Sequence, residues 1–546
     1  MIRRLGANFE PPLYYAKSGA DGSSRGLDGP QTERQSGSPR DVDRADFPAQ
    51  KRSHWWDDEG DFFPASEAAM EALRFRLITQ KTGVARHTIP DSQIDFFTEK
   101  DLATNLAQTS PKHHRSMLAR GQANQHRVVH ITSSAGDGTR GGGYPRMLIP
   151  LNMTELIPGR EQQDELRRQN DIYRSPGSYA TIFNSTVAGR TPDVPSPRTH
   201  DSFAQELRNQ AEAKIAATLE GVETDPRVLT SMVAMFITDS LASMKGGDFP
   251  FFIWTSRKQH RRLLNSFRAF QNDFDRREYT PDTKLQRVIV EALERRFEYI
   301  AKSKYKTPFF AYQEEFRGYH PENHDPPFEV HRGGAGNSEG AGALVRFMHE
   351  SGLSADLYGE GRDIVLWNNG EVHNDVQKIL GAHLETNFPV SVVVVPEQEG
   401  YSGGWPFIAK FRGGRRLVMI EQELLTDSFK ARMVDQRKSG GNFFNTNTLC
   451  FPTTEGPLHE AGDEVVSEAL TGIGFEFRND LWVPKLNMQA IAAKRRTAAI
   501  GGRVPDEYEH LKSLSDFLDR GEHVVLALRH RWERDAREIR LMSRRR

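Results

Sequence analysis

The order of apolar and polar positions between Pro326 and Pro396 predicts a compact α+β unit. Alternating positions indicate strands, and apolar positions three and four apart indicate amphipathic helices. Six elements are predicted in the order strand, helix, strand, strand, helix, strand, over 328–331, 343–351, 356–358, 363–367, 374–385 and 390–395. This order is that of a ferredoxin-like sandwich, so we expect a ferredoxin-like βαββαβ unit.

A hairpin is predicted directly after this unit. Residues 407–412 and 415–420 read as strands on either side of Gly413-Gly414, which is typical of a two-residue turn. Such a hairpin would extend the sheet of the unit. Across the turn we expect Arg412 to face Arg415 and Phe411 to face Arg416.

Helical patterns dominate the stretch before the unit. Residues 285–300 carry apolar positions at three-and-four spacing, and a further helix is predicted after Trp254. The fold class predicted is therefore α+β, with a central helical domain before the sandwich, a disordered N-terminal arm and a helical C-terminal tail. The predicted domains are 1–65 (disordered arm), 66–198 (mixed lead-in with a glycine-rich hairpin loop), 199–320 (helical), 321–485 (sandwich with hairpin) and 486–546 (basic helical tail).

Composition narrows the class of protein. Of 546 residues, 73 are Lys or Arg and 74 are Asp or Glu, so any electrostatic partnership must come from local patches. The single cysteine, Cys450, excludes a disulfide framework within one chain and any multi-cysteine zinc module. No apolar run approaches the length of a membrane span, so we expect no membrane partner.

The first 20 residues have a weak mitochondrial targeting character. They carry Arg3, Arg4 and Lys17 against the single acid Glu10, although Pro11 and Pro12 interrupt any long amphipathic helix. Residues 18–52 contain almost no large apolar side chain and are predicted to be disordered. We therefore expect a mitochondrial matrix protein, with a cytoplasmic or virion protein as the alternatives.

Basic clusters are the main candidates for a binding surface. Like charges at close spacing repel each other, and an anionic partner would relieve that repulsion. Trp405 and Phe411 offer stacking surfaces beside the basic hairpin. A solvated basic face is the alternative for each cluster. The predicted nucleic-acid-binding residues are Arg257, Lys258, Arg261, Arg262, Arg268, Trp405, Lys410, Phe411, Arg412, Arg415, Arg416, Lys494, Arg495 and Arg496.

Glycine-rich loops are the second kind of candidate. The loop 332–342 joins a predicted strand to a helix, so its amides could bind a phosphate through Gly333, Gly334, Gly336, Ser338 and Gly340. The segment 336–340 also matches GxSxG, but no series of parallel strands precedes it, which argues against a serine hydrolase. A second loop, Ser133 to Gly143, has five glycines and could wrap a phosphate between two hairpin strands.

These features favour a non-catalytic RNA-binding subunit of a larger ribonucleoprotein assembly, with RNA and other protein subunits as partners. No catalytic residue, cofactor or metal ligand is predicted, since HExxH, GxxxxGK[ST] and kinase motifs do not occur in the sequence. Two alternatives stay open. One is a capsid or virion scaffold protein, and the other is an enzyme that binds a phosphorylated ligand at loop 332–342.

Overall fold

A computed structural model describes the parts of the chain from which the fold is built, all within the unit Arg44–Arg546. The described residues are 90–134, 149, 151, 153–157, 159–174, 250–256, 309–313, 317–319, 330–332, 348–349, 352–369, 376–398, 401, 404–411, 414–421, 425–438, 440–454, 474–478, 481–485, 496–504, 508–511, 514–524, 526–527 and 530.

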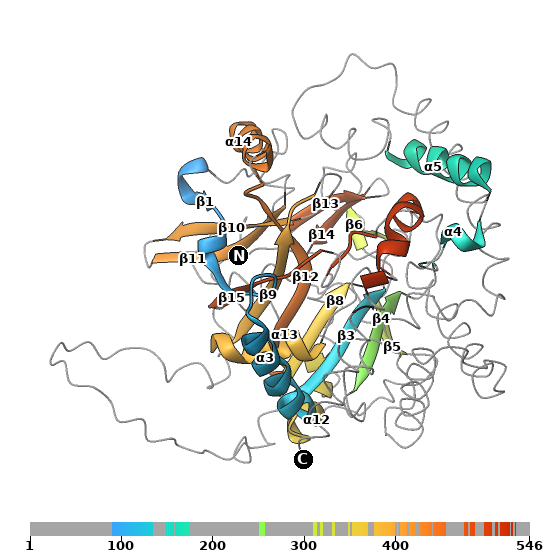
Figure 1. The fold of residues 1–546 in the computed structure, drawn as a ribbon. Coiled ribbons are helices and arrows are strands. Elements are labelled where there is room, and N and C mark those ends of the chain that lie inside the picture. The colour runs from blue at the N-terminus through green and yellow to red at the C-terminus, as the bar shows by residue number, and fades with distance from the viewer. Residues whose placement is uncertain are drawn as a thin grey trace, which may run out of the picture. The chain divides into compact units, whose positions relative to one another are not determined.

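An eight-stranded sheet is the centre of the fold (Figure 1). In spatial order its strands are β2 (Leu102–Asn105), β15 (Thr497–Gly501), β9 (Val390–Pro396), β12 (Phe443–Pro452), β8 (Ile364–Asn369), β3 (Val128–Ser134), β4 (Phe251–Ser256) and β5 (Phe309–Gln313). Strand β12 is antiparallel to both its neighbours, and the other neighbouring pairs are parallel. The strands on the two sides of β12 therefore all run in one direction.

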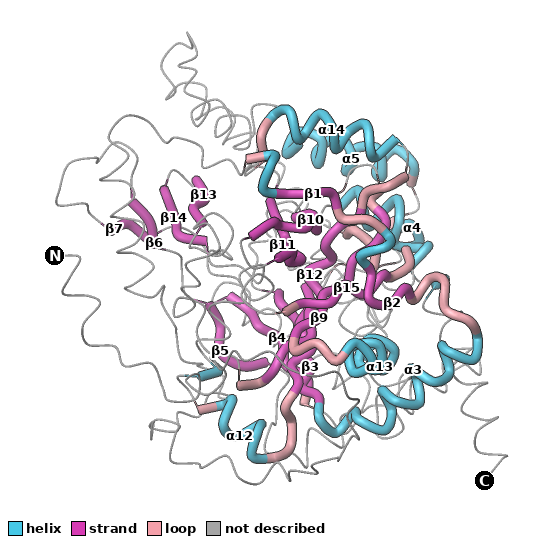
Figure 2. The backbone as a smooth tube through the Cα atoms, turned by 90° about the vertical axis from the view of Figure 1, so that its left-hand side faces the viewer, coloured by secondary structure: helices cyan, strands magenta, loops and turns pink. Residues whose placement is uncertain are grey.

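Helices α3 (Pro111–Asn124) and α13 (Val376–Thr386) lie side by side against one face of this sheet (Figure 2). The two helix backbones approach closely at two glycines. A Cβ at Gly121 would lie 1.9 Å from the Gln377 carbonyl oxygen, and one at Gly381 would lie 2.0 Å from the Met117 carbonyl oxygen. Only glycine permits this contact, which buries Ile379 and Leu380 against the sheet.

The opposite face of the sheet is covered by a short helix and by a second, smaller sheet. Helix α12 (Leu353–Gly359) packs there together with β10 (Gly404–Phe411) and β11 (Gly414–Glu421). The hairpin β10–β11 pairs with β1 (Ile94–Phe96) to form a three-stranded sheet. Helix α14 (Asp427–Lys438) lies beside β1 in both views.

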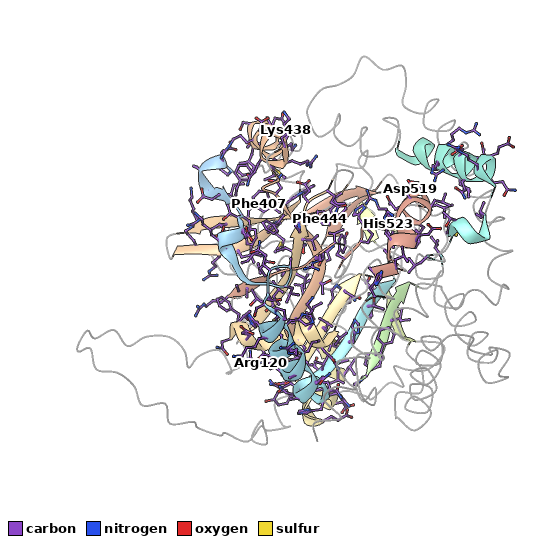
Figure 3. All side chains as sticks on the ribbon, viewed as in Figure 1. Arg120, Phe407, Lys438, Phe444, Asp519 and His523 are labelled. Carbon is purple, nitrogen blue, oxygen red and sulfur yellow. The ribbon has the colours of Figure 1, made fainter. Side chains whose placement is uncertain are left out.

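An aromatic cluster joins the second sheet to β12. Phe407 of β10 packs edge-on against Phe429 of α14, with ring centroids 5.3 Å apart, and Trp405 lies edge-on to Phe444 of β12 at 6.0 Å. Figure 3 labels Phe407 and Phe444 within the packed side chains of this region. The cluster is buried, so it fixes β12 and the hairpin as one core.

The remaining described elements are shorter or separate. A four-stranded antiparallel sheet has the order β13 (Gly474–Arg478), β14 (Leu481–Lys485), β6 (Arg317–Tyr319) and β7 (Val330–Arg332). Others are η4 (Asp91–Gln93), η5 (Glu99–Asp101), η6 (Gln125–Arg127), α4 (Met153–Leu156), α5 (Arg160–Arg174) and a helical stretch over 514–524. No described helix has the length and apolarity needed to cross a membrane.

The fold class α+β is confirmed, but the described strands do not form the predicted ferredoxin-like unit. The strand predicted at 328–331 corresponds to β7, which pairs with β6 in the separate sheet. Residues 356–358 belong to helix α12, because Leu353 and Leu357 are spaced one turn apart and both are buried. Strands β8 and β9 and helix α13 form as predicted, within the larger mixed sheet.

Other predicted elements also differ from the structure. Strands β4 and β5 fall in the segment 199–320, which was predicted to be helical, and β15 falls in the predicted helical tail. The hairpin β10–β11 forms a sheet with β1 and does not extend the central one. The predicted disordered arm, 1–65, lies outside the described residues.

Candidate functional site

The strand order places a topological switch point between β3 and β8. From β3 the chain adds β4 and then β5 in one direction, whereas β8 is inserted on the other side of β3. In open sheets with parallel strands, connections that diverge in this way leave a crevice at the carboxyl ends of the strands, and ligands bind there. The carboxyl ends of β3 and β8 are therefore the first place to look for a site.

Three buried polar side chains lie at this end of the sheet, and we call them the switch cluster: Thr132 of β3, Asn368 of β8 and Thr448 of β12. Thr132 and Asn368 are paired across the two strands. Thr448 is one position beyond the Leu449–Trp367 pair of β12 and β8, which brings it next to Asn368. Residues paired across a ladder project from the same face, here the face covered by α13.

Each member of the switch cluster has a polar atom without a hydrogen-bond partner among the described residues. The atoms are Thr132 Oγ1, Asn368 Oδ1 and Thr448 Oγ1, and all three residues have a relative exposure of 0%. A buried polar atom without a partner costs about 1–3 kcal/mol. Three such atoms on adjacent strands therefore lower the stability of the folded protein, and a bound polar ligand would remove this penalty by forming hydrogen bonds with them.

The Asn368 amide contacts the side chain of His130. Asn368 Nδ2 lies 3.3 Å from His130 Nε2, and His130 sits two residues before Thr132 on β3. The His130 ring is fully buried and meets Phe251 edge-on, with ring centroids 5.3 Å apart. The nitrogen of the amide therefore faces His130, and the oxygen has no partner among the described residues.

Strand β12 is distorted at the same level of the sheet. Its pairing with β9 shifts between Asn445 and Thr448, and Asn447 has φ 57°, a left-handed conformation. Asn445 and Asn447 bond each other, from Asn445 Nδ2 to Asn447 Oδ1 at 2.8 Å and from the Asn447 amide to Asn445 Oδ1 at 3.0 Å. Bulges and left-handed non-glycine residues cluster next to active sites, where they redirect side chains.

The glycine-rich segment 135–143 follows the carboxyl end of β3 directly. Its residues lie outside the described ones, but the segment begins directly after β3, one of the two strands at the switch point. The hairpin predicted for this loop does not include β3, because β4 and β8 occupy both edges of that strand in parallel.

Helix α13 contributes its amino-terminal end to the same edge. It connects β8 to β9, which run in the same direction, so it must return antiparallel to them and begin near the carboxyl end of β8. The partial positive charge of a helix N-terminus favours anions.

A second polar group follows the carboxyl ends of β9 and β15 and consists of the buried Tyr401 and Glu509 with the half-buried Arg520. Glu509 Oε1 lies 3.4 Å from Arg520 Nη1 and accepts a bond from the backbone amide of His510 at 3.1 Å. Burial raises the pKa of the Glu509 carboxyl, and the bond from His510 opposes that shift. Burial likewise raises the pKa of the Tyr401 phenol, whose hydroxyl has no partner among the described residues.

The basic hairpin has a different register from the one predicted. Lys410 pairs with Arg415 and Phe411 with Gly414, so Arg412 does not face Arg415. The carboxylate of Asp95 on β1 lies 2.7 Å from Lys410 Nζ and 3.5 Å from an Arg415 guanidinium nitrogen. The repulsion expected at the hairpin is thus relieved within the chain.

Other predicted binding residues are buried, engaged or outside the described part. Trp405 is only 3% exposed and cannot stack on a nucleic-acid base. The Arg496 guanidinium lies 5.0 Å from the centre of the Phe388 ring, and Arg416 is half-buried on β11. Outside the described residues lie Arg257, Lys258, Arg261, Arg262, Arg268, Arg412, Lys494, Arg495, Gly333, Gly334, Gly336, Ser338 and Gly340, and the Phe411 side chain is not described either.

Sequence reasoning missed the switch cluster. Asn368-Asn369-Gly370 is typical of a turn, and no element was assigned to 443–452, where polar residues interrupt the apolar pattern. The available signal was the run Asn445 to Thr448 between apolar residues, which is unusual for a buried strand. Among the described residues no group of three or more His, Cys, Asp or Glu side chains could hold a metal ion.

Comparison with known proteins finds similar solved structures only. No family model and no curated protein matches the chain. A UDP-glucose pyrophosphorylase point mutant from Leishmania major is 13% identical, with a TM-score of 0.48 over 83% of this chain and 75% of that one. A UDP-glucose phosphorylase from Trypanosoma brucei is 14% identical, with a TM-score of 0.46 over 83% and 77%.

A third such structure, another Leishmania major UDP-glucose pyrophosphorylase mutant in complex with UDP-glucose, is 12% identical, with a TM-score of 0.44 over 84% of this chain and 79% of that one. These similar structures are enzymes of nucleotide sugars and not ribonucleoprotein subunits. The RNA-binding hypothesis, with RNA as a partner, is wrong, because Asp95 pairs with the basic residues of the hairpin and Trp405 is buried.

Proposed function

We propose that the protein is an enzyme that binds a phosphorylated ligand rich in hydroxyl groups, of the nucleotide-sugar class, at the carboxyl edge of the central sheet. The observation that carries this proposal is the switch cluster. Three of its atoms, Thr132 Oγ1, Asn368 Oδ1 and Thr448 Oγ1, have no hydrogen-bond partner in the described part of the chain and lie on adjacent strands at the switch point. This develops the enzyme alternative of the sequence analysis but moves the site away from loop 332–342.

The phosphate part of the ligand is assigned to the side of β3. Segment 135–143 carries five glycines and Arg140, and it follows the carboxyl end of the switch strand. Glycine-rich connections at this position bring backbone amides close to phosphate oxygens. The amino-terminal end of α13 adds a favourable field for the same negative charge.

The hydroxyl-bearing part is assigned to the switch cluster and the β12 bulge. Amide and hydroxyl side chains bind sugar hydroxyls through neutral hydrogen bonds, and all members of the cluster are uncharged. Of the described residues at this place, Thr132, Asn368, Thr448 and Asn445 carry no charge and offer an extended anion no side-chain cation. The phosphate and the hydroxyls are therefore recognised by different parts of the same edge.

Thermal unfolding of the purified full-length chain tests the proposal. The probes are UDP-glucose, UDP and UTP, with glucose and inorganic phosphate as controls that carry only one of the two features. UDP-glucose at a hundredfold excess over its Kd should stabilise the protein by about 2.7 kcal/mol. Turnover is followed by mass spectrometry of the same samples.

The expected result is stabilisation by UDP-glucose that exceeds the effect of either control. A melting temperature that does not change with any phosphorylated probe at millimolar concentration contradicts ligand binding. The ligand is also incubated with pyrophosphate, phosphate or water as the second substrate. If the ligand binds but is not converted under any of these conditions, the proposal that the protein is an enzyme is contradicted, while the proposed binding site is not.

A further inference from the structure

The contact between His130 and Asn368 determines which kind of ligand group the site accepts. An amide NH₂ group can only donate hydrogen bonds, and Asn368 Nδ2 meets His130 Nε2 at 3.3 Å. When the amide nitrogen is the donor in this contact, Nε2 is the unprotonated nitrogen of the imidazole and the ring proton is on Nδ1. Both side chains have a relative exposure of 0%.

The orientation of the amide follows from this contact. With its nitrogen bound to His130, Asn368 presents its oxygen, which has no partner among the described residues. A carbonyl oxygen accepts hydrogen bonds and does not donate them. If His130 were instead the donor, the amide would be reversed and would present two N–H groups at the same place.

We infer that His130 is a positioning residue that fixes Asn368 as an acceptor, so that the site selects a hydroxyl of the ligand and excludes a phosphate oxygen at this point. Resting on the proposed function, this assigns the switch cluster to the sugar portion of a nucleotide sugar. The Thr132 and Thr448 hydroxyls, which can donate or accept, complete the set of hydrogen bonds around that ligand hydroxyl. His130 lies on β3, the strand next to that of Asn368, and acts through the amide.

Ligand discrimination tests this inference. Wild type is titrated with UDP-glucose and with derivatives in which one sugar hydroxyl at a time is replaced by fluorine, which cannot donate a hydrogen bond. One derivative should bind wild type at least about tenfold more weakly, because it leaves the buried Asn368 oxygen unpaired. Equal binding of all derivatives overturns the inference, while the binding of UDP-glucose itself still supports the proposed function.

Two variants separate positioning from packing. His130→Gln keeps an acceptor for Asn368 Nδ2 and should retain the discrimination. His130→Leu removes the acceptor and should reduce the discrimination to less than about threefold, while UDP, which lacks the glucose moiety, should bind as it does to wild type. Loss of discrimination in both variants, or in neither, contradicts a positioning role. Circular dichroism and thermal unfolding establish that each variant is folded.

A measurement without ligand keeps the inference testable if no nucleotide sugar binds. In protein labelled with ¹⁵N-histidine, the imidazole signals of His130 are identified as those absent from His130→Gln. The inference requires a protonated Nδ1 and an unprotonated Nε2. A protonated Nε2 would reverse the amide and overturn the inference, whatever the outcome for the proposed function.

Discussion

Thr132 and Asn368 face each other across β3 and β8, both fully buried, and each has an oxygen without a hydrogen-bond partner among the described residues. Strands β3 and β8 are separated by more than two hundred residues of sequence, so this pair exists only because the fold inserts β8 beside β3. A sequence under selection for stability alone would place apolar side chains at these positions.

Replacing a switch-cluster hydroxyl by a methyl group should therefore stabilise the protein without ligand. We expect Thr132→Val and Thr448→Val each to raise the free energy of unfolding by about 1 kcal/mol, because an unpaired buried oxygen is removed at constant shape. Denaturant unfolding measures this change.

Thr446→Val is the matched control for these substitutions. The Thr446 hydroxyl donates to the Val393 carbonyl oxygen at 2.8 Å and accepts from the Thr448 amide at 3.2 Å. Its loss should lower the free energy of unfolding by about 1 kcal/mol. If all three variants are destabilised equally, the switch-cluster hydroxyls are satisfied in the native state and the site loses its main support.

The close contact of α3 and α13 predicts that Gly121→Ala and Gly381→Ala are each destabilising by about 3 kcal/mol. The new methyl group would lie about 2 Å from a backbone carbonyl oxygen, and backbone cannot move aside as a side chain can. Gly159→Ala is the control, since its neighbour is the flexible Gln162 side chain at 3.2 Å. A change below about 0.5 kcal/mol in both helix variants would show that the helices are further apart.

The lowered pKa of His383 leads us to expect a loss of stability in mild acid. Burial, followed by the charge of Arg127, lowers the pKa of His383 from 6.5 to about 4, while Asp363 opposes the shift. In the unfolded chain His383 therefore becomes protonated near pH 6.5, whereas in the folded chain it becomes protonated only near pH 4. The stability that this histidine contributes is present above pH 6.5 and falls, by about 3 kcal/mol in all, as the pH drops through that window.

The variant His383→Gln isolates this effect, because glutamine does not titrate and can keep a bond to Ser391, whose hydroxyl lies 2.8 Å from His383 Nδ1. The free energy of unfolding, measured from pH 7 to pH 4, should fall less steeply in the variant. Glu509 has a raised pKa and changes stability in the opposite sense above about pH 4.5, but it is common to both proteins and cancels in the difference. Parallel pH profiles would contradict a neutral, buried His383.

The elements that could be predicted from the sequence are those in which the spacing of apolar residues within the element is enough to identify a helix or a strand. The apolar run of β9 is too short for a core helix, and Ile379, Leu380 and His383 of α13 repeat at helical spacing, so both were found. Helix α12 was missed because seven residues show hardly two turns of any period. Strand β12 was missed because its four polar residues between Phe444 and Leu449 break the apolar alternation.

The candidate site could not be predicted in the same way. Thr132, Asn368 and Thr448 come from three distant segments, and local pattern does not reveal which parallel strands become neighbours. Charge was misleading for a related reason. The basic hairpin was interpreted without Asp95, which β1 brings to Lys410 from more than three hundred residues away.

Isothermal titration of UDP-glucose into wild type and into a Thr132→Val, Thr448→Val double variant tests the central claim most directly. The double variant should be folded and at least as stable as wild type, because two unpaired oxygens are gone. The account predicts saturable binding to wild type and at least about tenfold weaker binding to the double variant, with binding of UDP alone unchanged. Equal affinity of the two proteins for UDP-glucose, or no binding to wild type, would contradict a ligand site at the switch cluster.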